Sequence, residues 1–150
     1  MTTAGSELDM LATLGWMLDQ EIVALPHVLR AVMLSADGLP ITGSKEVNRD
    51  LAERTAAAVT GMQAVSREAA EFVDRDDENG ESSIGPWELT MIQYENGFLF
   101  VMAAGAGTYL AVSTGKEADA EAVSFTMEKV IDCIGEKLGL LPRETTRPES

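Results

Sequence analysis

Three strand-like runs follow one another in the second half of the chain, at residues 87–95, 98–104 and 108–114. Only short, glycine-containing connections separate them, Asn96-Gly97 in the first case and Gly105-Ala106-Gly107 in the second. Two parallel strands need a crossover of about a dozen residues or more, whereas antiparallel neighbours can be joined by a tight turn. The three runs therefore predict an antiparallel meander and exclude a doubly wound parallel sheet.

Two further runs, at residues 28–34 and 39–42, precede the meander and are dense in aliphatic side chains. Ser35-Ala36-Asp37-Gly38 lies between them, and an Asp-Gly pair favours a hairpin because glycine tolerates the positive φ of a tight turn. Pro40 has no N–H to donate to a neighbouring strand. We therefore expect the second of these runs at an edge of the sheet.

Three amphipathic segments are predicted to be helices. The first has Ser6 as its predicted N-cap and ends before Pro26, and the third spans residues 118–138 with Gly139 just past its end. The apolar face of the first comprises Leu8, Leu11, Leu14, Leu18, Ile22 and Leu25. The apolar face of the third comprises Val123, Met127, Val130, Ile131, Ile134 and Leu138.

The second helix is predicted to begin after an N-cap at Asn48 and to run to about Asp74. Its apolar side chains keep a strict alternation of four and three residues, which is typical of one helix face. We expect this stripe to lie on the sheet. It comprises Leu51, Thr55, Ala58, Met62, Val65, Ala69 and Phe72.

The predicted order is α-β-β-α-β-β-β-α, which favours an α+β domain with a five-stranded antiparallel sheet. The chain has 150 residues, of which 45% are hydrophobic and 24% charged, as expected of one globular domain. We expect the domain to cover residues 6–139, with a disordered N-terminus at 1–5 and a flexible tail at 140–150.

Charge narrows the classes of partner. The 25 Asp and Glu against 11 Lys and Arg give a formal net charge of -14, which disfavours nucleic acid and anionic lipid surfaces. The lone Cys133 cannot form an internal disulfide, and the N-terminus lacks the basic start and apolar run of a signal peptide. The longest apolar stretch, 98–106, is too short to cross a bilayer. A cytoplasmic protein without membrane insertion is expected.

Four fragments resemble catalytic or ligand-binding motifs, but each lacks other residues that the motif requires. Gly105-Ala106-Gly107 and Gly115-Lys116 miss the further residues of a dinucleotide fingerprint and of a P-loop. Ser113 lies in a degenerate nucleophile elbow, but the only histidine, His27, precedes it in the chain. The acidic stretch 74–81 has the wrong register for a calcium loop. We expect no catalytic residue, cofactor or metal, and an enzyme ranks third among the functions considered.

The run Val32-Met33-Leu34-Ser35-Ala36-Asp37-Gly38-Leu39-Pro40-Ile41 resembles the first hairpin of the roadblock/dynein light chain family. The alanine-rich second helix, the strand pair around Asn96-Gly97-Phe98-Leu99-Phe100-Val101 and the Tyr109-Leu110-Ala111-Val112 strand follow in the family's order. The resemblance covers residues 6–138 and is greatest to bacterial single-domain members. The long acidic segment 74–85 departs from the pattern.

This resemblance implies a profilin-like sandwich with the second helix on one face of the sheet and the first and third helices on the other. It also implies a homodimer in which third strands pair edge to edge and second helices lie side by side. The implied partner is a small Ras-like GTPase. Some bacterial relatives stimulate the GTP hydrolysis of such a GTPase or act as a platform that positions it. The alternative is a subunit that holds a sensor-kinase-like or motor partner without affecting hydrolysis.

The residues themselves point to two candidate interface regions. Small side chains on one flank of the second helix leave room for another backbone, and an apolar third strand at a sheet edge needs a cover. The candidate dimer or partner residues of the helix are Ala56, Ala57, Thr60, Gly61 and Ala64. Those of the strand are Trp87, Leu89, Met91 and Gln93.

Overall fold

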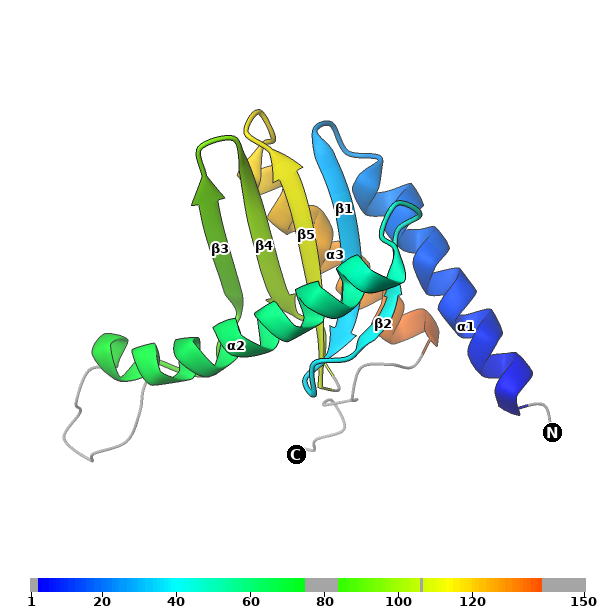
Figure 1. Ribbon diagram of the computed structural model, residues 1–150, viewed down its shortest axis with the longest axis horizontal. Coiled ribbons are helices and arrows are strands. Elements are labelled where there is room, and N and C mark those ends of the chain that lie inside the picture. The colour runs from blue at the N-terminus through cyan, green and yellow to red at the C-terminus, as the bar shows by residue number, and fades with distance from the viewer. Residues whose placement is uncertain (1–2, 75–83, 106, 139–150) are drawn as a thin grey trace.

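The computed structural model describes residues 3–74, 84–105 and 107–138. Its elements follow the predicted order. They are α1 (Thr3–Met17), the π-helical turn η1 (Leu18–Val23), β1 (Val28–Ser35), β2 (Pro40–Gly43), α2 (Arg49–Val73), β3 (Leu89–Tyr94), β4 (Gly97–Ala103), β5 (Thr108–Gly115) and α3 (Ala120–Leu138). Figure 1 shows α2 crossing one face of the sheet while α1 and α3 cover the other.

The five strands form one antiparallel sheet in the order β2-β1-β5-β4-β3. Successive side chains of a strand point to opposite faces, so each central strand contributes to two cores. Met33 and Phe100 pack with α1, η1 and α3, where Leu14, Leu18 and Met127 are fully buried. The smaller core beneath α2 comprises Val32, Leu34, Ala52, Ala56, Val59, Val101 and Ala111.

The first helix begins earlier than the sequence predicts. Because α1 already includes Thr3, Ser6 lies inside the helix and the predicted N-cap at Ser6 is wrong. A serine costs a helix interior only about 0.5 kcal/mol, so it does not fix where the helix starts. The predicted apolar face is confirmed at Leu14, Leu18 and Ile22, whereas Leu8 is exposed.

The β1–β2 and β3–β4 hairpins both form as predicted, but only the first has its glycine in the turn. Gly38 has the positive φ of 89° that the β1–β2 turn requires, and β2 lies at the sheet edge predicted from Pro40. In the β3–β4 hairpin Tyr94 pairs with Gly97, so Glu95 and Asn96 form the turn and Gly97 belongs to the strand. A Cβ at Gly97 would lie 2.5 Å from the Thr114 carbonyl oxygen, so close approach explains this glycine.

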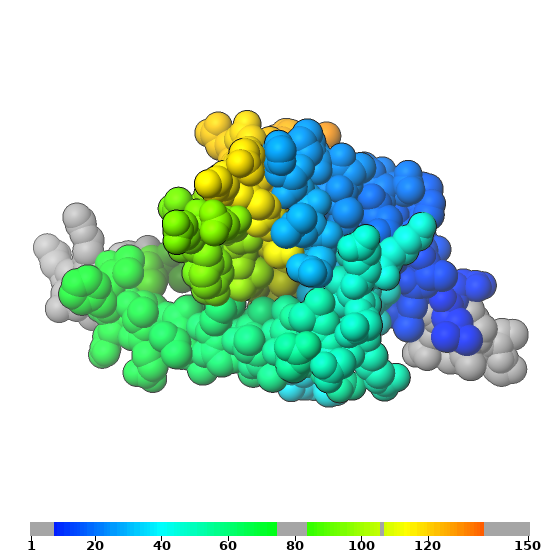
Figure 2. Space-filling view, turned by 45° about the horizontal axis from the view of Figure 1, so that its top comes forward, coloured from blue at the N-terminus to red at the C-terminus, as the bar shows by residue number. Residues whose placement is uncertain are grey.

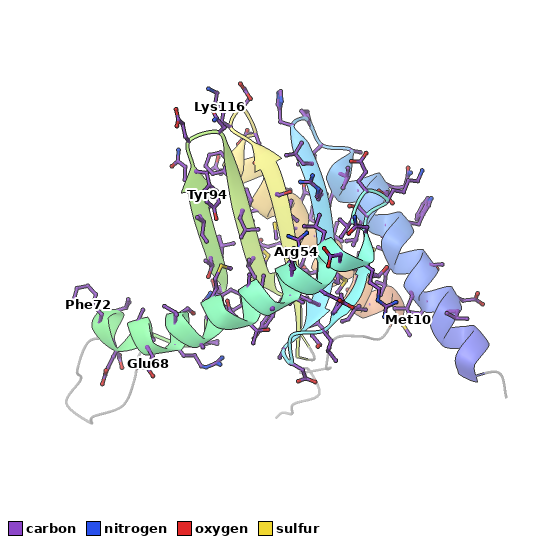
Figure 3. The ribbon with its side chains drawn as sticks, viewed as in Figure 1. Met10, Arg54, Glu68, Phe72, Tyr94 and Lys116 are labelled. Atoms are coloured by element: carbon purple, nitrogen blue, oxygen red, sulfur yellow. The ribbon has the colours of Figure 1, made fainter. Side chains whose placement is uncertain are left out.

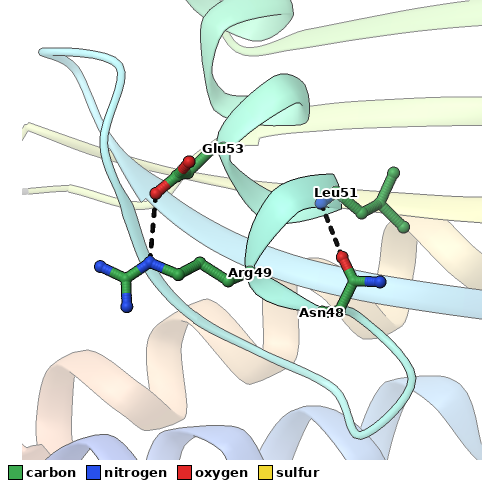
Figure 4. Close-up of polar contacts among 4 residues, drawn as sticks. All are labelled: Asn48, Arg49, Leu51 and Glu53. Atoms are coloured by element: carbon green, nitrogen blue, oxygen red, sulfur yellow. Dashed lines mark hydrogen bonds and ion pairs between the residues drawn. The ribbon is translucent and has the colours of Figure 1, made fainter.

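The second helix begins as predicted, but its buried face is displaced. The Asn48 side chain accepts a hydrogen bond from the Leu51 N–H at 2.8 Å, which caps the helix (Figure 4). The buried positions are Ala52, Ala56, Val59 and Gln63, one residue along from the predicted stripe. Since one residue is about 100° of helix rotation, the prediction that the four-three stripe lies on the sheet is wrong.

Some sequence expectations lie outside the described residues. These are the flexible tail at 140–150, the greater part of the acidic segment at 75–83, and Gly139 after the third helix. Within the described ranges, no helix combines the length and the apolar character that a bilayer crossing needs.

Candidate interaction surfaces

The β3 edge presents apolar side chains to solvent. Leu89 and Met91 are 41% and 48% exposed, and Gln93 on the same side of the strand is exposed as well. Their register partners on β4 are Met102, Phe100 and Phe98, so these three side chains lie on the face of the sheet that α1 and α3 cover. No strand of the described chain pairs with the outer side of β3.

Trp87, which the sequence groups with this edge, is held within the chain. Its indole Nε1–H donates to the Thr90 hydroxyl at 2.8 Å, and its ring meets Tyr109 edge to face at 5.6 Å between centroids. The side chain is half-buried and contacts the core under α2. Trp87 therefore anchors the start of β3, leaving Leu89, Met91 and Gln93 as the exposed row.

The small residues of α2 do not form one surface. Ala56 is fully buried against the sheet, so its assignment to an outer flank is wrong. Thr60 is half-buried beside the β1–β2 turn, where a Cβ at Gly38 would lie 3.0 Å from the Thr60 hydroxyl oxygen. Ala57, Gly61 and Ala64 are exposed. These three remain available to a partner.

Beyond Gln63, α2 contributes no buried residue among those that the structure describes. Residues 64–73 continue past β3 (Figure 1). In this overhang Val65 is 67% and Phe72 is 94% exposed, and Figure 3 shows Phe72 far from the sheet. A phenylalanine this exposed on a helix makes the overhang a candidate surface for contact with another molecule.

The first half of the same stripe borders an open groove. Leu51, Thr55 and Ala58 line one side of a groove of about 320 Å³, and the sheet forms its floor. The floor includes Arg30 on β1, Ser113 on β5 and Leu99 on β4, which are neighbours across the three strands by register. Figure 2 shows α2 as a ridge along the border of this sheet face, continuing beyond the strands.

The apolar stripe of α2, from Leu51 to Phe72, therefore does not point at the sheet beneath the helix. It points along the sheet surface, toward the part that α2 leaves uncovered. Sequence reasoning found these residues but assigned them to the wrong neighbour. The signal was the period, because an unbroken alternation of four and three averages 3.5 residues and is the pattern by which one helix packs lengthwise against another. A helix lying across a sheet needs only the short stretch that contacts the strands.

Charged groups on the outer side of α2 form two exposed i,i+4 pairs. Arg49 pairs with Glu53, and Arg54 pairs with Asp50, each with 3.2 Å between nitrogen and oxygen (Figure 4 shows the first). Pairs this exposed contribute little stability. They make the outer face of the helix polar in the two turns that precede Ala57.

The catalytic fragments are not brought together. Ser113 lies in β5 opposite Arg30, and its hydroxyl has no hydrogen-bond partner. The exposed His27 has a φ of 69°, and its carbonyl accepts the Gly115 N–H at 2.8 Å. Among the residues the structure describes, no group of His, Cys, Asp and Glu could hold a metal ion, while the acidic segment 75–83 is not among them.

The chain is similar to known proteins of one kind. The model of the Roadblock/LC7 domain family matches residues 14–114. A Roadblock/LC7 domain from Streptomyces avermitilis is 29% identical with a TM-score of 0.69, covering 83% of this chain and 96% of that one. The gliding protein MglB of Thermus thermophilus is 15% identical with a TM-score of 0.64, covering 87% and 89%.

A further similar structure is Myxococcus xanthus MglB, 13% identical with a TM-score of 0.65, covering 89% of this chain and 97% of that one. At such identities the two MglB structures show the shared fold alone. Among curated protein sequences, none matches the chain.

Proposed function

The chain belongs to the Roadblock/LC7 domain family, and on this premise we propose that it is a non-catalytic homodimer that provides a platform for a small Ras-like GTPase. One observation carries the proposal: an apolar helix stripe and an apolar strand edge are both uncovered at the same border of the sheet, the β3 border. The family expectation of a GTPase-associated regulator supplies the class of partner.

A second copy fits both uncovered features at once. If two β3 strands pair antiparallel about a two-fold axis, the two sheets become one and each edge is covered. The overhang of each α2, residues 64–73, then extends over the other copy's sheet. The sheet face that it meets is the part beside the groove, where Arg30, Ser113 and Leu99 are not covered by their own α2.

The two helices then lie side by side with their four-three stripes in contact. An antiparallel pair centred between Gly61 and Met62 places Leu51 opposite the partner copy's Phe72 and Ala58 opposite its Val65. Just outside this seam, Arg54 lies within one residue of the position opposite Glu68 of the other copy, so opposite charges flank the apolar contact. Every exposed apolar residue of the stripe gains a neighbour in this arrangement.

The outward-facing small residues remain for the GTPase. Ala57, Gly61 and Ala64 are exposed, and a Cβ added at Gly61 would have no atom within 4 Å. The backbone of a partner can therefore approach this flank closely. Acidic side chains, Glu53 and Glu68 among them, border this flank. A complementary basic rim on the GTPase would speed association, and added salt would slow it.

Binding to the full chain tests the proposal. The immobilised protein should retain a small GTPase from the cells that produce it, with a difference between GTP-analogue and GDP conditions. Ala64→Arg should abolish this retention and Glu128→Arg on α3 should leave it intact, each with the dimer confirmed by light scattering. Retention lost only in Glu128→Arg would refute the placement, and retention of a sensor-kinase-like protein independent of nucleotide would favour the scaffold alternative.

A further inference from the structure

A second groove lies on the opposite face of the sheet, between α3 and the β3–β4 hairpin. It has a volume of about 400 Å³. Its walls come from three places in the sequence, the residues before β3, the end of β4 and the middle of α3. We propose that this groove binds a basic, amphipathic segment of a partner protein. The groove is formed within one protomer, so the inference does not depend on the proposed dimer.

The floor of the groove is apolar and partly open to solvent. Met102 from β4 and Ile131 from α3 are only 6% and 8% exposed, and they form its deep part. Leu89 from β3 is 41% exposed beside them, and Trp87 lines the same groove. An apolar side chain entering between Leu89 and Ile131 would bury surface that the chain itself leaves wet.

The rim of the groove is acidic on both sides. Glu88 stands on the strand side, and Glu128 and Asp132, one helical turn apart, stand on the α3 side. No basic residue is among those that line the groove. The ion pairs found among the described residues, Arg49–Glu53 and Arg54–Asp50, both lie on α2, so none of them neutralises this rim.

The neighbouring cation on α3 is directed to another contact. The Lys129 ammonium lies 5.5 Å from the centroid of the Phe125 ring, in a cation–π arrangement. The three rim carboxylates are thus left to a ligand or to water. An apolar floor between two acidic rims is complementary to a segment in which an apolar residue stands between lysines or arginines.

Isothermal titration calorimetry gives a direct measurement of binding. The ring of Trp87 packs in the core under α2, on the other face of the sheet, so its fluorescence is not the readout. The probe is a synthetic amphipathic helix of leucine and lysine, titrated into the full-length protein at moderate salt. We expect saturable binding of this peptide, whereas a leucine and glutamate peptide of the same length should not bind.

Two neutralising variants separate the groove from general attraction to an acidic protein. Glu128→Gln/Asp132→Asn should weaken binding of the lysine peptide about fivefold to tenfold. Glu21→Gln/Glu46→Gln, at exposed positions outside the groove and outside the proposed GTPase surface, removes the same amount of charge and should leave the affinity unchanged. Equal weakening by both variants would overturn the proposal.

The floor and the other occupants complete the test. Leu89→Ser should weaken the lysine peptide by about tenfold, and an unchanged affinity would overturn the assignment of the floor. If Glu128→Gln/Asp132→Asn instead abolished self-association beyond a dimer in light scattering, a second copy would be the occupant. Binding of a peptide of residues 139–150 with the same dependence would assign the groove to this chain's own tail.

Discussion

The two borders of the sheet are built in opposite ways. β2 has only four residues, all half-buried, and its first residue is the proline that cannot donate a backbone hydrogen bond. α1 lies alongside it, and the Thr42 hydroxyl donates to the Leu11 carbonyl at 3.4 Å. β3 has six residues without proline and leaves Leu89 and Met91 open to solvent. The first border blocks strand addition, while the second permits it.

α2 continues the same contrast. It begins near β2, where Asn48 caps it and Ala52 is buried, and it ends beyond β3 with Phe72 in solvent. One border therefore fixes the helix to its own sheet. The other border presents a strand edge and a helix end together, which is what a symmetric partner needs.

The largest expected effect is at the overhang. Val65→Glu places an unpaired carboxylate in each half of the proposed helix seam and should weaken the dimer by about 3 kcal/mol, roughly a hundredfold. Because Val65 is 67% exposed in one protomer, the fold itself should survive. Analytical ultracentrifugation checks the dimer, and circular dichroism checks the fold.

Ala57→Glu is the matched control for this change. It adds the same charge to an exposed position of the same helix, on the flank that faces away from the seam. The dimer should persist in this variant. If both variants dissociate, or neither does, the seam is not the dimer contact.

The next effect concerns the β3–β4 hairpin. Gly97→Ala forces a Cβ against the Thr114 carbonyl oxygen, 2.5 Å away, and should lower the free energy of unfolding by about 2 kcal/mol while loosening the pairing border. Urea denaturation measures the loss. Gly61→Ala, where no atom lies within 4 Å of the new Cβ, should not destabilise the protein.

A smaller effect is expected at the β2 border. Asn48→Ala removes the side-chain acceptor of the Leu51 N–H and should cost about 1 kcal/mol of folding stability. The dimer should be largely unaffected, because Asn48 itself precedes Leu51, the first residue of the proposed seam. A variant that unfolds at the same temperature as the parent would show that the cap contributes nothing.

The smallest expected effect tests the register in which the two α2 helices pair. Glu68→Arg should weaken the dimer by about 0.5 kcal/mol at low salt, since it opposes Arg54 of the other copy with a like charge. Adding Arg54→Glu to the same chain should restore the affinity. Failure of the double variant to recover would contradict the antiparallel register centred between Gly61 and Met62, even if a dimer forms.

The order of elements and the antiparallel sheet follow from local signals in the sequence. Asp37-Gly38 and the short connections of the meander allow only hairpins, and Pro40 keeps its strand at an edge. The capping asparagine Asn48 marks the start of α2 correctly. Such features depend on residues close together in the chain, which is why they can be recognised without knowing what packs on them.

The choice of which helix face is buried was decided only by tertiary structure. Two apolar faces run along α2, about 100° apart around the helix. The one rich in large residues, including Leu51, Val65 and Phe72, looks more suitable for a core than the alanines of the other. The sheet nevertheless takes the small side chains of Ala52 and Ala56, because they let the helix lie close to the strands. The sequence by itself determines that α2 is a helix with a periodic apolar stripe. Because the hydrophobic effect is non-directional, the sequence does not determine which neighbour an apolar stripe packs against. Only the packed sheet shows which face of the helix is buried and which part of the stripe stays exposed.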